Sequence, residues 1–174
     1  MKRLASLDQQ VFEWIAKHTS TYEKKALMSF FKGVSKTGDG HLYFILAAIL
    51  YYLDKEHGVL FFYTALLAYS FEVPMYLALK HVFKRTRPCD LLLNFKSIVI
   101  PSDKFSLPSG HTAAAFLMAT IIAHFYPTVG AVAYIWASFV GISRIVLRVH
   151  FPLDVIIGMA LGVSVANTSI NILG

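Results

Sequence analysis

Long stretches without charged side chains limit most strongly what this chain can fold into. Residues 112–143 run for 32 positions without Asp, Glu, Lys or Arg, which is too long for one helix across a bilayer. The pair Tyr126-Pro127 interrupts this stretch, and a proline commonly marks a turn between helices. We therefore expect two membrane-spanning helices here, joined at this pair.

Three further apolar segments occupy residues 40–53, 58–79 and 155–174. The first has only 14 residues, which is short for a span, and the second contains Glu72. With the pair of helices above, these segments predict five spans. The last segment also holds Gly158 and Gly162, a GxxxG spacing that permits close helix packing, either within the chain or in a homodimer.

The composition favours the same class of protein. Residues of the set AVILMFWYC make up 56% of the 174 residues, and charged residues make up only 15%, against about 25% in soluble domains. A small soluble domain cannot bury so much apolar surface. The expected fold class is all-α: a polytopic membrane helix bundle with five to six transmembrane helices.

The N-terminal region, residues 1–36, has a different pattern. Apolar residues recur there at helical spacing, with Lys, Asp and Glu between them. This pattern is typical of amphipathic helices that lie in the membrane interface, and a tilted sixth span is the alternative. We therefore divide the chain into an N-terminal amphipathic region, residues 1–36, and a transmembrane domain, residues 37–174.

Three polar clusters interrupt the apolar segments. If five helices alternate across the membrane, the connections 80–111 and 144–154 open on the same side, and their side chains can form one site. The clusters are K-x6-RP at Lys80–Pro88, PSGH at Pro108–His111 and SR-x5-H-x3-D at Ser143–Asp154.

The first property that these clusters share is an attraction for anions. Lys80, Arg87 and Arg144 supply positive charge, and the planar arginine fork matches phosphate oxygens. Ser109 and Gly110 stand where a helix is expected to begin, and the free backbone N–H groups of a helix start attract anions. The combination indicates a phosphate site.

The second property is nucleophile and proton chemistry. His150 precedes Asp154 by four residues, and a carboxylate bonded to one imidazole nitrogen leaves the other nitrogen as a nucleophile or base. His111 has no carboxylate nearby in sequence and suits the role of general acid. Neither an acidic cluster nor an HExxH motif favours a metal site, so we expect no metal ion and no cofactor.

On these residues the chain resembles the type 2 phosphatidic acid phosphatase (PAP2) superfamily, which combines the same three motifs. The resemblance covers about residues 38–165 and includes Gly38-Asp39-Gly40. It implies a metal-independent phosphomonoesterase or pyrophosphatase with a phosphohistidine intermediate. It also implies His150 as the nucleophile, Asp154 as its partner, His111 as the acid, and a phosphate site made of Lys80, Arg87, Ser109, Gly110 and Arg144.

Within this superfamily the apolar spans favour a membrane lipid phosphatase for a phosphatidylglycerophosphate, phosphatidate, undecaprenyl pyrophosphate or lipid A headgroup. Glu72 either shapes the headgroup pocket or packs between helices. Lys96 and Lys104 either contact a second phosphate or remain solvated loop charges. The alternatives are a non-catalytic lipid-phosphate binding or transport protein and, less favoured, a relative of soluble acid phosphatases or vanadium haloperoxidases.

Sixteen Lys and Arg against ten Asp and Glu give a formal net charge of +6. The chain has no basic run or motif for nucleic acid, so we interpret the charge as membrane flanking and partly as a property of the anion site. The resemblance implies a multi-pass protein of the inner (plasma) membrane with its site on the periplasmic face. The positive-inside rule, taken literally, would instead turn the site to the cytoplasm.

Overall fold

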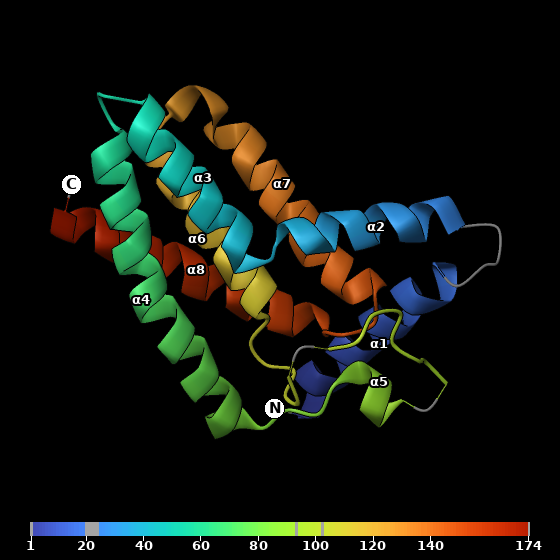
Figure 1. Cartoon of the computed structure of the whole chain (residues 1–174). Coiled ribbons are helices and arrows are strands. Elements are labelled where there is room, and N and C mark those ends of the chain that lie inside the picture. Colours follow the sequence, from blue (N-terminus) through green and yellow to red (C-terminus); the bar gives the residue numbers. More distant parts are fainter. Residues whose placement is uncertain (1, 20–24, 93, 102, 174) are drawn as a thin grey trace.

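The computed structural model describes residues 2–19, 25–92, 94–101 and 103–173, and all regular structure in these ranges is helical. This confirms the all-α fold class. Figure 1 shows the helices in chain order. They are α1 (Lys2–His18), α2 (Lys25–Thr37), α3 (Gly40–Leu53), α4 (Gly58–Phe83), α5 (Pro88–Leu91), α6 (Gly110–Phe125), α7 (Pro127–Val146) and α8 (Pro152–Leu173).

The apolar segments of the sequence correspond to five helices of the bundle. In the described residues, α4, α7 and α8 are long and apolar enough to cross a membrane, whereas α3 and α6 are shorter apolar helices. The predicted break at Tyr126-Pro127 is confirmed, because α6 ends at Phe125 and α7 begins at Pro127. The count of five spans stays a prediction, since two of the five helices fall short of the usual length.

Helix α6 forms the centre of the bundle and packs most extensively against α7 and α8, with further contacts to α4 and α3. Its side chains are buried from Thr112 to Ile121 without a break. Close packing with α8 depends on the GxxxG pair. A Cβ on Gly162 would lie 2.1 Å from the carbonyl oxygen of Ala113, and a Cβ on Gly158 would lie 2.6 Å from that of Ser109. The pair therefore serves helix packing within the chain.

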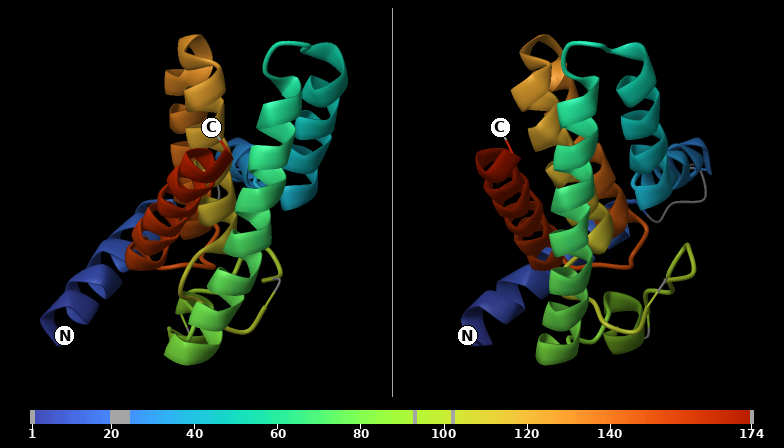
Figure 2. Two further views of the ribbon diagram at one scale, coloured as in Figure 1. Left: turned by 90° about the vertical axis from the view of Figure 1, so that its left-hand side faces the viewer. Right: turned by 60° about the vertical axis from the view of Figure 1, so that its left-hand side comes forward.

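The two connections that carry the polar clusters lie at the same end of the bundle. Figure 2 shows the α4–α6 and α7–α8 connections together at one end and the α3–α4 and α6–α7 turns at the other. This is the arrangement that alternating helices predict, and it brings three distant sequence motifs into one region.

The amphipathic helices α1 and α2 pack on this same end of the bundle. Helix α1 buries Phe12 against Phe151, and α2 buries Val34 against α6 and α7, while Trp14 and Phe30 remain exposed. Exposed apolar side chains beside lysines are typical of helices at a membrane interface. Helix α1 also contributes Asp8 to the polar network described next.

Candidate active site

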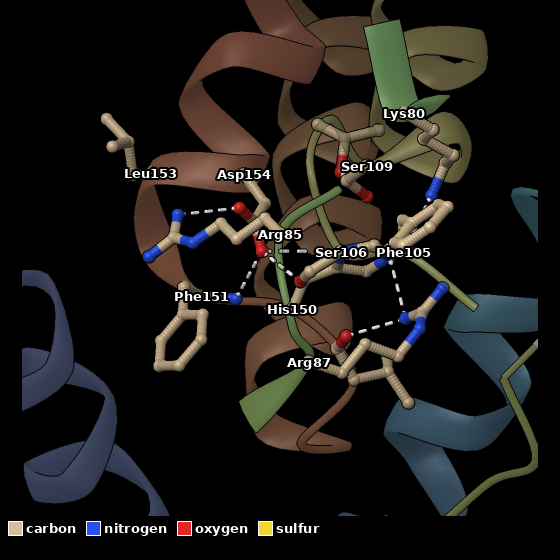
Figure 3. Close-up of polar contacts among 12 residues, drawn as sticks. Lys80, Arg85, Arg87, Phe105, Ser106, Ser109, His150, Phe151, Leu153 and Asp154 are labelled. Atoms are coloured by element: carbon tan, nitrogen blue, oxygen red, sulfur yellow. Dashed lines mark hydrogen bonds and ion pairs between the residues drawn. The ribbon is translucent and has the colours of Figure 1, made fainter. Parts of the chain in front are cut away.

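The three motifs meet around a cavity of about 320 Å³ whose lining includes Lys80, Gly110, His111 and His150. Figure 3 shows the polar contacts at the centre of this site. Lys80 comes from the last turn of α4, Gly110 and His111 begin α6, and His150 lies in the connection between α7 and α8. Each polar side chain therefore stands at a helix end, where the apolar packing of the bundle fixes its position.

The carboxylate of Asp154 is held at several points in the first turn of α8. Its Oδ2 atom accepts a hydrogen bond from the Phe151 backbone N–H at 2.8 Å and another from the Ser106 hydroxyl, and its Oδ1 accepts one from Arg85 at 2.7 Å. His150 Nδ1 lies 3.6 Å from Oδ2 and 3.5 Å from the Ser106 hydroxyl. The predicted His150–Asp154 pair is thus present as a contact longer than an ordinary hydrogen bond, with Ser106 close to both partners.

His150 is almost completely buried. Burial lowers the pKa of His150 to about 3, and the positive charges of Arg144 and Arg87 act in the same direction. The imidazole is therefore neutral at physiological pH. Its Nε2 atom faces Arg87 Nη1 at 3.5 Å, so the nitrogen opposite Asp154 lies beside a guanidinium that can bind an anion.

Asp103 bridges two of the predicted phosphate ligands. Its carboxylate accepts hydrogen bonds from Lys80 at 3.0 Å and from Arg87 Nη2 at 2.8 Å. Burial alone would raise the pKa of Asp103, but the charges of Lys80 and Arg87 outweigh it and hold the pKa below its ordinary value. Further hydrogen bonds to the carbonyls of Phe105 and Val149 fix Lys80 and Arg87. The two cations are therefore preorganised side by side.

The start of α6 is fixed against α8. The backbone N–H of Ser109 donates to the carbonyl oxygen of Asp154 at 3.0 Å, and the hydroxyl of Thr112 donates to Ser109 Oγ at 2.9 Å. The Ser109 N–H is therefore used within the protein. From Gly110 onward the first N–H groups of α6 have no carbonyl of an earlier helical turn to bond, and Gly110 lines the cavity.

His111 has a carboxylate partner in space. Its Nε2 lies 2.9 Å from Oδ1 of Asp39, which stands 72 residues earlier, directly before α3. The expectation of no carboxylate near His111 held only for neighbours in sequence. Gly38 allows this connection to pack closely on α7, because a Cβ there would lie 2.7 Å from the Val140 side chain. Asp39 therefore fixes the orientation of the His111 imidazole.

The remaining predicted residues lie in three different settings. Arg144 is buried, donates to the hydroxyl of Ser35, and lines a second cavity beside His111. Glu72 is buried and lines the catalytic cavity, and its Oε1 has no hydrogen-bond partner among the described residues. Lys96 and Lys104 are exposed, and neither is among the residues that line these two cavities.

Several polar residues of the site carry no signal in the sequence. Arg85 bonds both Asp154 and Asp8 of α1, and the Leu153 backbone N–H donates to Asp8 at 2.8 Å. These contacts join residues far apart in the chain, so no spacing rule could find them. Asp39 had the best available signal, since it lies in the Gly38-Asp39-Gly40 stretch that resembles the family. The residues missed by sequence reasoning are Asp8, Asp39 as the partner of His111, Arg85, Asp103 and Ser106.

An apolar hollow lies next to the catalytic cavity. It has a volume of about 240 Å³ and is lined by side chains of α3 and α4, including Phe44 and Phe62. Gly40, Tyr69 and Val73 line both spaces. The polar site therefore adjoins an apolar space between two helices of the bundle.

The part of the chain that carries this site also decides its family. The family model described as the PAP2 superfamily matches residues 57–174, more than half of the chain. The chain belongs to the PAP2 superfamily. This PAP2 protein is also similar in structure to Aquifex aeolicus LpxE, with a TM-score of 0.80, 30% identity and 93% of each chain covered.

A second solved structure shares the fold. It is the first transmembrane PAP2 type phosphatidylglycerolphosphate phosphatase from Bacillus subtilis, with a TM-score of 0.76, 24% identity, and coverage of 99% of this chain and 87% of that one. Both likenesses extend over α1 and α2, which carry no signature motif. The shared fold therefore includes the N-terminal helices.

Curated relatives match over shorter segments. The lipid A 1-phosphatase of Porphyromonas gingivalis is 40% identical over 90 residues, which is 49% of this chain and 18% of that protein. The bacitracin transport permease protein BcrC of Bacillus licheniformis is 38% identical over 77 residues, covering 44% and 38% of the two chains. Phosphatidylglycerophosphatase B of Bacillus subtilis is 32% identical over 127 residues, covering 67% and 58%. Two of these relatives are named for phosphatase activities, and the aligned segments span less than two thirds of each relative.

Proposed function

We propose that this protein hydrolyses a lipid phosphomonoester or pyrophosphate headgroup through a phosphohistidine intermediate and without a metal ion. The observation that carries the proposal is the neutral, buried His150, whose Nε2 lies beside Arg87 at the cavity. Among the described residues, no group of three or more His, Cys, Asp or Glu is arranged to hold a metal ion. Positive charge at the site comes from Lys80, Arg87 and Arg144.

In the first step the phosphate group binds these three cations and the N–H groups at the start of α6. The lone pair of His150 Nε2 attacks phosphorus, so that a P–N bond forms and the P–O bond to the leaving group breaks. His111, oriented by Asp39, gives a proton to the leaving oxygen. Stabilisation of the equatorial oxygens by preorganised cations supplies most of the catalysis of phosphoryl transfer.

In the second step water attacks the phosphohistidine. His111 has lost its proton and now accepts one from the water, and the P–N bond breaks to release inorganic phosphate and neutral His150. Asp154 keeps His150 in one orientation and stabilises the positive charge that the ring carries while it is phosphorylated. Ser106 and Arg85 in turn fix the carboxylate of Asp154.

The apolar hollow between α3 and α4 supports a lipid substrate. It has almost no polar lining and shares residues with the catalytic cavity, so an acyl or prenyl chain can lie in it while the phosphate reaches His150. The relatives with printed activities are a lipid A 1-phosphatase and a phosphatidylglycerophosphatase, and both activities concern lipid phosphates. Glu72 lines the polar cavity but not the apolar hollow, and it would contact the bound headgroup.

His150→Ala tests the proposal. Purified protein in detergent micelles is given phosphatidate, phosphatidylglycerophosphate, undecaprenyl pyrophosphate and lipid A, and released phosphate is measured. We expect at least about a thousandfold loss of activity, as for other essential nucleophiles. His124→Ala is the matched control, because His124 is exposed in the last turn of α6, far from the cavity. Full phosphate release by His150→Ala would refute the mechanism, and no release by the unchanged protein would favour a binding or transport role.

The site is further proposed to face the outer side of the inner membrane. Lys104→Cys in a Cys89→Ser background places one thiol on the exposed part of the α4–α6 connection. A membrane-impermeant maleimide should label this cysteine in intact spheroplasts. Labelling only after permeabilisation would put the site on the cytoplasmic face.

A further inference from the structure

We propose that Glu72 determines substrate specificity by accepting a hydrogen bond from a hydroxyl or amide N–H of the unit that carries the phosphate; this inference rests on the proposed function. The preferred lipids are then those whose phosphate is attached to a glycerol or a sugar with a free donor group. Lipids whose phosphate is attached to a fully acylated glycerol, or through phosphate to a prenyl chain, are disfavoured.

Glu72 is buried in the middle of α4 without a partner. Its side chain is only 1% exposed, and its Oε1 atom has no hydrogen-bond partner among the described residues. It also takes part in none of the ion pairs that these residues form. A buried polar group without a partner costs free energy. An ionisable residue of this kind within a membrane-spanning helix indicates a functional site.

The position of Glu72 on α4 relates it to the bound phosphate. Glu72, Tyr76 and Lys80 follow one another at intervals of four residues, so they lie on one face of the helix, and all three line the catalytic cavity. Lys80 binds the phosphate in the proposed mechanism. The eight residues from Lys80 back to Glu72 correspond to about 12 Å of helix, and they lead from the end of the bundle with the polar connections toward its middle (Figure 2). A phosphate bound at Lys80 therefore leaves the part of the cavity beside Glu72 to the unit attached to it.

The apolar hollow adjoins this part of the cavity. Tyr69 and Val73 line both spaces, and they stand three residues before and one residue after Glu72 on α4. Glu72 itself does not line the hollow. With the lipid chains in the hollow and the phosphate at Lys80, the group that meets the carboxyl of Glu72 belongs to the headgroup between them.

The carboxyl group selects the chemistry of that headgroup. A carboxyl oxygen accepts hydrogen bonds, so its partner is a donor. The terminal glycerol of phosphatidylglycerophosphate has a free hydroxyl beside the carbon that carries the phosphate, and the sugar of lipid A has hydroxyl and amide N–H groups. Phosphatidate and undecaprenyl pyrophosphate have no such donor. A site built to hydrogen-bond a substrate donor rejects an analogue that lacks it, because the polar group of the site then stays unpaired.

Two lipids that differ in one hydroxyl test this role together with the variant Glu72→Leu. They are phosphatidylglycerophosphate and its analogue with propane-1,3-diol in place of the terminal glycerol, both in uncharged detergent micelles. The kcat/KM of the unchanged protein should be about tenfold higher for the natural lipid, and Glu72→Leu should bring this ratio close to one. Because the two lipids carry the same charges, any effect of removing a charge from the cavity cancels in the ratio.

Lipid A and undecaprenyl pyrophosphate extend the test to a sugar unit. The ratio of kcat/KM for lipid A to that for undecaprenyl pyrophosphate should also fall about tenfold in Glu72→Leu. A fall in this ratio alone assigns the donor to a sugar, and a fall in the first ratio alone assigns it to a glycerol.

Two further variants separate recognition from structure. Glu72→Gln keeps the shape of the side chain and an amide oxygen that accepts hydrogen bonds, so it should retain part of the preference. Thr64→Val is the matched control, because Thr64 Oγ1 is likewise buried on α4 without a partner among the described residues but lines neither the catalytic cavity nor the hollow. This control should leave both ratios unchanged. The Tm of Glu72→Leu in detergent should not fall, since leucine replaces a carboxyl that has no partner in the protein.

The outcomes distinguish this role from the proposed function. Ratios in Glu72→Leu equal to those of the unchanged protein, or an equal loss of kcat/KM on every lipid with a lower Tm, would overturn the role of Glu72 while leaving the phosphatase intact. Failure of the proposed function itself would show instead as no phosphate release by the unchanged protein or full release by His150→Ala.

Discussion

Gly158→Ala should separate the two halves of the active site without changing any polar residue. Gly158 lies one turn after Asp154 on α8, and a Cβ there would meet the carbonyl oxygen of Ser109 at 2.6 Å and Thr112 Cβ at 3.3 Å. Ser109 directly precedes α6 and donates its N–H to the Asp154 carbonyl. The added methyl group therefore pushes the start of α6, which carries Gly110 and His111, away from the turn that carries His150.

The size of the displacement follows from the contact distance. Cβ atoms essentially never approach another heavy atom closer than 3.0 Å, and the contact to Ser109 would begin at 2.6 Å, so the backbones must separate by at least about 0.4 Å. A misplacement of about 1 Å can cost about a hundredfold in rate. A loss in kcat of about five- to tenfold is therefore expected. Overpacking should also cost about 1–3 kcal/mol of stability, partly offset by the better helix propensity of alanine.

The assay compares kcat for phosphatidate and thermal unfolding in detergent. Gly130→Ala is the matched control, because its Cβ would meet Ala123 at 2.9 Å near the other end of α6. We expect the control to lower stability and leave kcat unchanged. If Gly158→Ala keeps the kcat of the unchanged protein while its stability falls, the contact of α8 with Ser109 does not position the catalytic groups.

Three further predictions concern an ion pair of the site, the pH dependence of stability, and the effects of EDTA and vanadate. Asp8→Asn removes one of the two carboxylates that Arg85 binds, so Arg85 should draw Asp154 away from Ser106 and His150. We expect kcat to fall by about tenfold and KM to change less than twofold. Equal effects of the substitution on kcat and KM would contradict this. Burial lowers the pKa of His150 to about 3, whereas a histidine in the unfolded chain has a pKa of about 6.5. The free energy of unfolding should therefore fall as the pH drops below about 6.5, by up to about 1.4 kcal/mol per pH unit. Denaturant titrations of His150→Gln should show a weaker dependence on pH. EDTA should leave phosphate release intact and vanadate should inhibit it competitively; activity that EDTA removes and Mg²⁺ restores would refute the metal-free mechanism.

The sequence predicted the parts of the fold that depend on apolar length and on proline. The break at Tyr126-Pro127 and the shared end of the two polar connections follow from these features alone, and both are present. It also predicted that α3 and α6 would be short, but not that α4 would continue past residue 79 to Phe83, because the ends of a helix depend on which residues its neighbours cover. Nor did it predict the direction of the GxxxG face, which requires knowing that α6 is the central helix.

The sequence likewise predicted some residues of the site and missed others. Residues with unusual chemistry and fixed spacing, such as His150 with Asp154, stand out in a sequence. Residues that act by pairing do not, because an aspartate that neutralises a cation can come from any element. Asp8 lies on α1 and Asp39 before α3, and their partners follow 77 and 72 residues later. Only the packed bundle brings such pairs together.

The pairing also changes the interpretation of the net charge. The site contains four permanent cations, which are Lys80, Arg85, Arg87 and Arg144. Four carboxylates lie among them, which are Asp8, Asp39, Asp103 and Asp154. Setting these eight residues aside leaves twelve Lys or Arg and six Asp or Glu, so the whole excess of six remains. The +6 is therefore not a property of the site, contrary to the expectation from the sequence.

The excess lies instead on exposed lysines, including Lys17, Lys25, Lys36, Lys84 and Lys96 on α1, α2 and the α4–α6 connection. Lysines around an interfacial end of the bundle attract anionic lipid headgroups. A balanced site has its own physical reason, since an uncompensated cluster of cations is costly in a low-dielectric setting. The carboxylate of Asp103, bonded to both Lys80 and Arg87, supplies that compensation, and an incoming phosphate must compete with it for the same two cations. Asp103→Asn should therefore tighten inhibition by vanadate, whereas weaker inhibition would show that Asp103 serves only to position the cations.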